Sequence, residues 1–308
     1  MQTTKNILLV RPADFAFNSE TAHSNAFQVK INGSADAVKQ EVLSEFENFA
    51  STLKKKGVNV FVFDDTPLPK KPDAIFPNNW VTFHADGTVI LYPMCASNRQ
   101  YERRPDILDK LRENFKITKV TDLSHYEKEK RFLEGTGSII FDHSNKIAYA
   151  CLSPRTDKEL FMEVCNVLHY SPVVFHTYDK DGKEIYHTNV MMCIGEQFAS
   201  VCLDSITDVQ EKKLVSQSLT KTGHKIIDIT FDQMNHFAGN MLEVQTNKNK
   251  KILVLSQSAF DCLRPDQKGE IEKHCELVPL SIKTIETIGG GSARCMIAEI
   301  FLQPLENK

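Results

Sequence analysis

A residue type suited to covalent chemistry lies in a glycine-rich loop: Cys295 follows three glycines in the stretch IGGGSARC. A thiolate is a strong nucleophile, and an imidazole and a carboxylate beside it can move protons and orient a substrate. Taken singly, the cysteine fits a buried thiol and the histidine a structural role. Their spacing suggests more, because polar residues recur before the cysteine at intervals of 53 to 55 residues: Asn79, Glu134, His187 and Asn240.

The elements that must position these residues repeat along the chain. A β-hairpin pattern with a turn signal precedes a helix pattern, and a single apolar strand follows each helix. The predicted hairpins cover residues 79–94, 138–153, 189–205 and 240–258. The predicted helices cover residues 34–56, 103–115, 156–170, 207–222 and 258–275, and serines 97, 153, 205 and 258 are candidate N-caps.

This repeat predicts an α/β fold, a five-bladed pseudo-symmetric α/β propeller of strand–strand–helix–strand units in a single domain, residues 1–308. The segment NILLVRP would complete the last hairpin, which begins in ARCMIAEIF. A closed ring has no open sheet edge and brings equivalent positions of all five units to its centre. The alternative is an ordinary α/β domain whose regular spacing is a coincidence.

Composition excludes several classes of function. The chain of 308 residues is 41% hydrophobic and has a net charge of -3, so neither a nucleic acid nor an anionic membrane is favoured as a partner. We expect a cytoplasmic protein with a small-molecule partner, no metal and no cofactor. Its eight cysteines show no CxxC pair, and Cys151, Cys193, Cys202 and Cys262 are expected to be buried thiols. The oligomeric state stays open, a homodimer being one option.

Several motifs together resemble a known superfamily. FLEGTGSIIF, YACLSPRTD, YHTNVMMCIG, AGNML and GGGSARC are similar, in this order, to motifs of the amidinotransferase, arginine deiminase and dimethylarginine dimethylaminohydrolase superfamily, the penteins. The resemblance extends over nearly the whole chain, from NILLVRP to CMIAEIF. It implies a five-bladed α/β propeller that uses a cysteine nucleophile, a histidine and acidic residues on guanidino or ureido carbons.

The resemblance also implies roles for individual residues. Cys295 resembles the nucleophile, His187 the general acid and base, and Glu134 the carboxylate that binds the nitrogen head of the substrate. Arg99 and Arg155 resemble the arginines that hold an α-carboxylate, a task suited to bidentate pairing. The remaining expected substrate contacts are Phe76, Asn78, Asn79, Gly137, Asn189 and Asn240.

The chain departs from the guanidine-acting members at three places where further carboxylates are usual. These places hold the pair Asn78-Asn79, Gly137 and Asn189. A guanidinium is a cation with five donors, whereas a ureido group is neutral and has a carbonyl acceptor that an amide can bind. The pocket therefore suits a neutral head, and the nearest resemblance is to citrulline utilization hydrolase. The expected reaction converts citrulline and water to ornithine, carbon dioxide and ammonia.

Other interpretations remain. Glu134 alone could bind a cation, as in an arginine deiminase or a dimethylarginine hydrolase. An amidinotransferase would need a second amine site, for which the sequence has no mark. A ring-shaped binding protein would need no Cys–His–Glu set. The segment RPADFAFN could add Phe15, Phe17 or Asn18 to the rim of the site or to the core.

Overall fold

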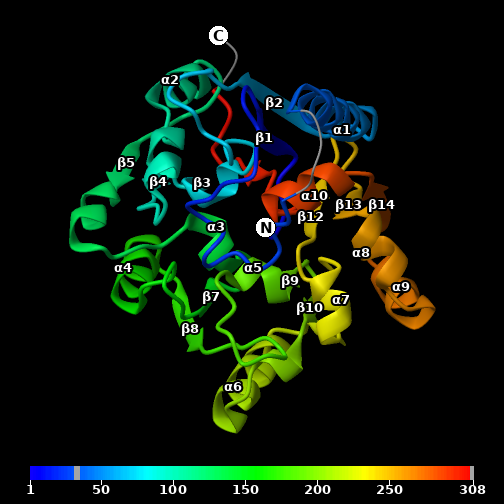
Figure 1. Ribbon diagram of the computed structural model, residues 1–308. Helices are drawn as coiled ribbons and strands as arrows, with labels where there is room; N and C mark the ends of the chain where they lie inside the picture. The colour runs from blue at the N-terminus through cyan, green and yellow to red at the C-terminus, as the bar shows by residue number, and fades with distance from the viewer. Residues whose placement is uncertain (31–34, 306–308) are drawn as a thin grey trace.

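The computed structural model describes residues 1–30 and 35–305, and its strands form five small sheets arranged in a ring (Figure 1). Each sheet has three strands, the middle strand pairing antiparallel with one neighbour and parallel with the other. The predicted five-bladed α/β propeller is therefore confirmed. Residue 34, the first of the predicted helix 34–56, lies outside the described residues.

The strands follow the predicted hairpins and single strands closely. Four blades are consecutive in the chain: β3 (Val81–Phe83), β4 (Thr88–Leu91) and β5 (Lys119–Asp122); β6 (Ile140–Asp142), β7 (Ile147–Cys151) and β8 (Ser171–Phe175); β9 (Met192–Ile194), β10 (Phe198–Val201) and β11 (Lys225–Asp228); β12 (Leu242–Gln245), β13 (Lys251–Ser256) and β14 (Glu276–Leu280).

The fifth blade joins the two ends of the described chain. Strand β1 (Asn6–Arg11) pairs antiparallel with β15 (Ala298–Glu299) and parallel with β2 (Asn59–Asp64). Leu8 of β1 faces Ala298 in this pairing. The prediction that NILLVRP completes the last hairpin is confirmed, and the ring closes through hydrogen bonds between segments that are far apart in sequence.

A helix follows the middle strand of every blade, as predicted. These helices are α1 (Ala35–Lys55), α2 (Pro105–Arg112), α4 (Lys158–Leu168), α6 (Val209–Lys221), and the pair α8 (Gln257–Cys262) and α9 (Pro265–Glu272).

Two expectations about the helices were wrong. The predicted helix 258–275 is split, because Pro265 lacks an N–H group and begins a new helix after Arg264. The caps also differ: the side chains of Asp157, Asp208 and Ser256 accept the first N–H groups of α4, α6 and α8. Carboxylates there satisfy free N–H groups and suit the helix dipole.

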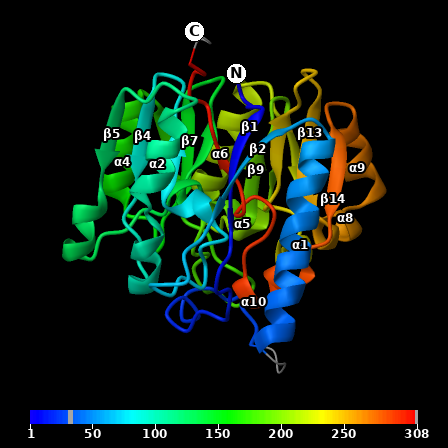
Figure 2. The same ribbon diagram turned by 90° about the horizontal axis from the view of Figure 1, so that it is seen from above.

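Short elements connect successive blades: the 3-10 helices η1 (Pro77–Asn79) and η3 (Ser124–Glu129), and the helices α3 (Gly135–Ser138), α5 (Thr188–Met191), α7 (Phe231–Asn235) and α10 (Lys283–Gly289). Two further 3-10 helices, η2 (Ser97–Glu102) and η4 (Leu203–Ser205), each lie within a blade, between its middle strand and its helix. Figure 1 shows α3, α5 and α10 nearest the centre. In Figure 2 the first and the last described residues lie on one face of the ring, and the described part of the segment between β1 and α1 extends to the opposite face.

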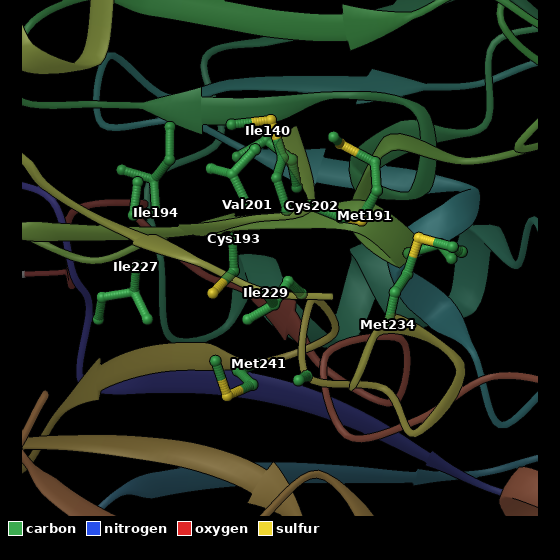
Figure 3. Close-up of a cluster of buried hydrophobic side chains, with 14 of the residues drawn as sticks. Ile140, Met191, Cys193, Ile194, Val201, Cys202, Ile227, Ile229, Met234 and Met241 are labelled. Carbon is green, nitrogen blue, oxygen red and sulfur yellow. The ribbon is translucent and has the colours of Figure 1, made fainter. Parts of the chain in front are cut away.

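Apolar side chains fill the spaces between the blades. The largest buried cluster joins the three blades formed by β6–β8, β9–β11 and β12–β14, with Met191, Cys193, Met234 and Met241 among its members (Figure 3). Methionine and cysteine adapt to irregular gaps, as expected where two twisted sheets meet. Cys151, Cys193 and Cys202 are buried as predicted, whereas Cys262 is only half-buried. No helix among the described residues combines the length and the apolar character needed to cross a membrane.

The connecting turns pack so closely at the centre that some positions have no room for a side chain. A Cβ atom at Gly239 would lie 2.3 Å from the carbonyl oxygen of Val190, and one at Gly135 would lie 2.3 Å from that of Asn78. Gly135 also has a φ of +46°, which other residues adopt reluctantly. The approach of one turn to the next therefore depends on glycine.

Substituting a glycine at the centre should destabilise the protein far more than substituting one at the surface. We expect Gly239→Ala to lower the free energy of unfolding by roughly 2–3 kcal/mol, because backbone must move to admit the methyl group. The control is Gly269→Ala in α9, where a Cβ would contact nothing within 4 Å. This substitution should raise the free energy of unfolding by about 0.5–1 kcal/mol. Urea unfolding measures both, and equal effects would contradict the central packing constraint.

Candidate active site

The repeat brings the five predicted positions to the turns at the centre of the ring. Asn79 ends η1, Glu134 precedes α3 and His187 precedes α5. Asn240 lies just before β12, and Cys295 lies in the turn between α10 and β15. All five are at most 7% exposed. Contacts between them cross from blade to blade, which the regular spacing predicted.

The sulfur of Cys295 lies beside two amide side chains. Asn240 Nδ2 is 3.2 Å from Cys295 Sγ, and Asn189 Nδ2 is 3.4 Å from it. Amide N–H groups can donate to a thiolate, and neither amide adds charge to the site. The arrangement places two N–H donors beside the sulfur.

The orientation of the Asn240 amide follows from its other contacts. Its Oδ1 accepts the backbone N–H groups of Arg294, at 3.1 Å, and of Cys295, at 3.4 Å. Its Nδ2 also donates to the backbone carbonyl of Asn189 at 2.9 Å. Because Oδ1 faces donors, Nδ2 must face the sulfur, so the turn that carries Cys295 orients the amide beside it.

His187 and Glu134 form a buried pair, with 2.8 Å between His187 Nε2 and Glu134 Oε2. Burial lowers the pKa of His187 to about 4, although the hydrogen bond to Glu134 opposes this, so the imidazole is neutral at pH 7. An ionised carboxylate only accepts, so Nε2 carries the proton and Nδ1 keeps the lone pair. The histidine can therefore accept a proton at Nδ1.

Glu134 is ionised although it is fully buried. Burial alone would raise the pKa of Glu134, but the charge of Arg155 and the hydrogen bond from His187 outweigh it and hold that pKa below the usual range. Arg155 Nη1 lies 3.5 Å from Glu134 Oε2, and the backbone N–H of Cys95 donates to Oε1 at 2.9 Å. Both oxygens of the carboxylate thus have protein partners.

Arg155 is also anchored by the segment between β1 and α1. Its Nε donates to Ser24 Oγ at 3.0 Å and its Nη2 to the carbonyl of Thr21 at 3.1 Å. The guanidinium lies 4.9 Å from the centre of the Tyr186 ring. In this conformation it holds the segment over the site, and its expected role toward a substrate carboxylate stays a prediction.

Arg99 orients Asn79. Its Nε and Nη2 donate to the two oxygens of Glu102, each at 2.9 Å, and its Nη1 donates to Asn79 Oδ1 at 2.7 Å. Since arginine only donates, the oxygen of the Asn79 amide must face it, and Nδ2 points away. Asn79 Nδ2 is buried and has no hydrogen-bond partner among the described residues. The expectation that Arg99 binds a substrate carboxylate stays a prediction, with most of its N–H groups already engaged.

The other predicted contacts divide into two groups. Phe76 lines the cavity and packs on the glycine loop, where a Cβ at Gly289 would lie 2.8 Å from its ring. Gly137 and Asn78 are not among the cavity-lining residues. A Cβ at Gly137 would lie 2.4 Å from Asn79 Nδ2 and 2.8 Å from His187 Nδ1, so this glycine makes room for both side chains. Asn78 is fully buried, and its side chain has no partner among the described residues.

Sequence reasoning missed Asp73. This carboxylate is 3% exposed and lines the cavity, so Glu134 is not the only carboxylate of the site. Burial raises the pKa of Asp73, opposed by the charge of Arg99, 3.8 Å away. Oδ2 accepts from Asn18 Nδ2 at 2.7 Å, while Oδ1 has no partner in the described part of the chain. The available signal was an aspartate followed directly by the apolar stretch AIF, a setting in which a carboxylate needs a partner.

The cavity is nearly closed. Its lining includes Thr21, Asn25 and Tyr186 in addition to the residues above, and it encloses about 20 Å³. That volume holds about one water molecule, whereas ligand pockets measure about 300–1,000 Å³. Asn25 Nδ2 donates to the carbonyl of Gly289 at 3.2 Å, which closes the segment over the glycine loop. Of the predicted rim residues, Asn18 contacts Asp73, whereas Phe15 is buried in the core.

The neutral state of His187 can be measured directly. We expect its imidazole, followed by NMR and assigned with His187→Gln, to titrate with a midpoint at about pH 4. Glu134→Gln should lower the midpoint further, because the carboxylate is what favours the charged imidazole against burial. A midpoint at about 6.5, the value of an exposed imidazole, would contradict the buried pair.

The fold is shared with several solved structures. An arginine dihydrolase of the ornithine–ammonia cycle in cyanobacteria, ArgZ, is 16% identical with a TM-score of 0.74, covering 97% of this chain and 41% of that one. The N-terminal domain of ArgZ, solved as a mutant bound to substrate, is 16% identical with a TM-score of 0.73. The match covers 96% of this chain and 99% of that domain. A dimethylarginine dimethylaminohydrolase, solved as an adduct with 4-chloro-2-hydroxymethylpyridine, is 15% identical with a TM-score of 0.65. The match covers 97% of this chain and 100% of that one.

The chain thus spans about two fifths of full-length ArgZ, and at these identities the likeness shows the fold. No match was found among curated proteins. The family described as N,N dimethylarginine dimethylhydrolase, eukaryotic, matches residues 11–302. With its propeller fold and this match over nearly its whole length, the chain belongs to the N,N dimethylarginine dimethylhydrolase family, within the superfamily of amidinotransferases, arginine deiminases and dimethylarginine dimethylaminohydrolases.

Proposed function

We propose that the protein hydrolyses the ureido group of citrulline, giving ornithine, carbon dioxide and ammonia through a covalent intermediate on Cys295. The family supports a cysteine-dependent hydrolase of C–N bonds, and the finer assignment concerns the head group of the substrate. A guanidinium presents only donors and a positive charge. A ureido group presents a carbonyl oxygen and no charge.

The orientation of Asn79 is the observation that carries the proposal. Arg99 occupies its oxygen, so Nδ2 is left at the site as a buried donor with no partner in the part of the chain that the structure describes. A donor facing a guanidinium would leave both groups unsatisfied, at a cost of about 1–3 kcal/mol for a buried polar group. A donor facing a ureido oxygen gains a hydrogen bond, which strengthens when that oxygen becomes negative.

The proposed reaction assigns each polar group a step. Cys295 Sγ, between the Asn189 and Asn240 amides, attacks the ureido carbon, and Asn79 Nδ2 donates to the resulting oxyanion. His187 accepts a proton at Nδ1, returns it to the leaving nitrogen, and then accepts one from the attacking water. Loss of the first nitrogen leaves a thiocarbamate on Cys295. Hydrolysis of its S–C bond restores the thiol and releases a carbamate, which breaks down to carbon dioxide and the second nitrogen product.

The cavity also contains groups that suit the α-amino and α-carboxyl groups of an amino acid. Asp73 Oδ1 is a buried acceptor with no partner in residues 1–30 and 35–305, as an α-ammonium group requires, and Arg155 offers a cation to an α-carboxylate. Glu134 is already compensated by Arg155 and His187. Because the cavity is nearly closed, entry of citrulline requires the segment that contains Thr21 and Asn25 to move.

A guanidine hydrolase is the second candidate, and Asp73 is the observation that favours it. As a buried carboxylate that lines the cavity, it provides negative charge for a cationic substrate. The family description and the arginine dihydrolase likeness are also consistent with a guanidino compound.

Product analysis with separate substrates decides between the two. We expect ornithine and ammonia from citrulline, with arginine and N,N-dimethylarginine left unchanged, because only a ureido oxygen satisfies Asn79. The Cys295→Ser variant should lose nearly all turnover and serves as the control for contaminating activity. Formation of citrulline from either guanidine would refute the neutral-head assignment and leave the cysteine mechanism in place.

Replacing Asn79 tests its role as a donor. Asn79→Asp has the same shape but only accepts, so we expect kcat for citrulline to fall by about 10²–10³-fold, the usual cost of losing one oxyanion donor. KM should change by less than about threefold, because the donor acts mainly in the transition state. Steady-state kinetics measure both values, with circular dichroism as the folding control. A variant that keeps more than half of the wild-type kcat excludes this role.

A further inference from the structure

An ion pair is buried directly beneath the turn that carries Cys295. Arg294 is 4% exposed, and its Nη2 donates to Glu299 Oε2 at 2.8 Å. The two residues flank the apolar stretch Met296–Ala298. Neither side chain is among those lining the candidate active site, so the proposed chemistry leaves this pair without a role.

Arg294 makes hydrogen bonds that fix the chain before and after Cys295. Its backbone N–H donates to Asn240 Oδ1 at 3.1 Å, and its side-chain Nη1 donates to the carbonyl of Ile297 at 3.0 Å. Residue 294 is therefore linked to residues 297 and 299, with Cys295 inside the linked segment. Glu299 also lies in β15, opposite Ile7 of β1, so the same guanidinium ties the turn to the strand that closes the ring.

Stability alone is a poor explanation for this pair. Taking two charges out of water costs free energy, and an apolar pair of similar volume is often at least as stable. A pair of charges does give direction, because an arginine donates in fixed directions to a few acceptors. These contacts hold a short turn in one geometry, which an apolar pair would not specify.

We propose that the Arg294–Glu299 pair positions the Cys295 thiol beside the amides of Asn189 and Asn240, with Arg294 as a positioning residue. The inference rests on the proposed function only in taking Cys295 as the nucleophile. It predicts that the pair affects the reactivity of the sulfur separately from the stability of the fold.

A double substitution separates these two effects. Arg294→Met or Glu299→Met alone leaves one buried charge without a partner, and each should lower stability. The double variant removes both charges and should regain wild-type stability in urea. In this variant we expect Cys295 to react about tenfold more slowly with iodoacetamide, as measured by mass spectrometry of the peptide that contains Cys295. We also expect its kcat to be about 10²-fold lower, with KM changed by less than about threefold, because the thiol is slightly misplaced.

A matched pair elsewhere in the ring provides the control. Arg103 Nη2 donates to Glu127 Oε2 at 2.9 Å and its Nη1 donates to the carbonyl of Tyr92 at 3.2 Å, with both charged side chains mostly buried. The double variant Arg103→Met with Glu127→Met should leave both Cys295 alkylation and kcat at wild-type values. Arg294→Lys, which keeps the charge but loses the two-point geometry, should slow alkylation as the double variant does.

The outcomes are distinct for the two proposals. A double Met variant that is stable and reacts as fast as wild type overturns the positioning role, and so does a wild-type Cys295 that does not react. Alkylation requires no substrate, so a fast wild-type thiol, a slow double variant and no turnover of citrulline would sustain the inference while refuting the proposed substrate.

Discussion

The close approach of five turns at the centre of the ring is the constraint on which the rest of the structure depends. Gly135 and Gly239 let one turn contact the backbone of the next, and Gly137 leaves room for the side chains of Asn79 and His187. With a methyl group at these positions the blades would move outward, and contacts between side chains of different blades would be lost. The site is therefore a property of ring packing, since its polar groups come from all five blades.

The amides at the centre are oriented by neighbours that can only donate. The guanidinium of Arg99 fixes Asn79, and backbone N–H groups of the cysteine turn fix Asn240. An amide that is free to flip would present its oxygen and its nitrogen alternately, and a preorganised donor costs no reorganisation during the reaction. Buried charge serves the same purpose, because Arg155 and His187 keep Glu134 ionised within the protein.

The repeat could be predicted from sequence because each unit has its own local signals. Turn residues, alternating strands and helix periodicity located the blades, and equal spacing brought Glu134, His187 and Cys295 together. Asp73 could not be found in this way, since it precedes the first repeated turn and belongs to no regular pattern. The pairing of Arg99 with Glu102 and Asn79 was equally hidden, because it depends on the path of a 3-10 helix. The spacing thus predicted which residues meet at the centre of the ring, but the hydrogen-bond partner of each polar atom follows only from the three-dimensional structure.

Closure of the ring by β1 and β15 has a consequence for the order of events during synthesis. Strand β1 is made before its antiparallel partner and cannot pair with it until residues 298–299 have been synthesised. Cys295, the proposed nucleophile, lies three residues before that partner. Nascent chains that already carry Glu134 and His187 therefore lack both this thiol and the closed ring that would place it, and the complete proposed catalytic set arises only when the ring closes.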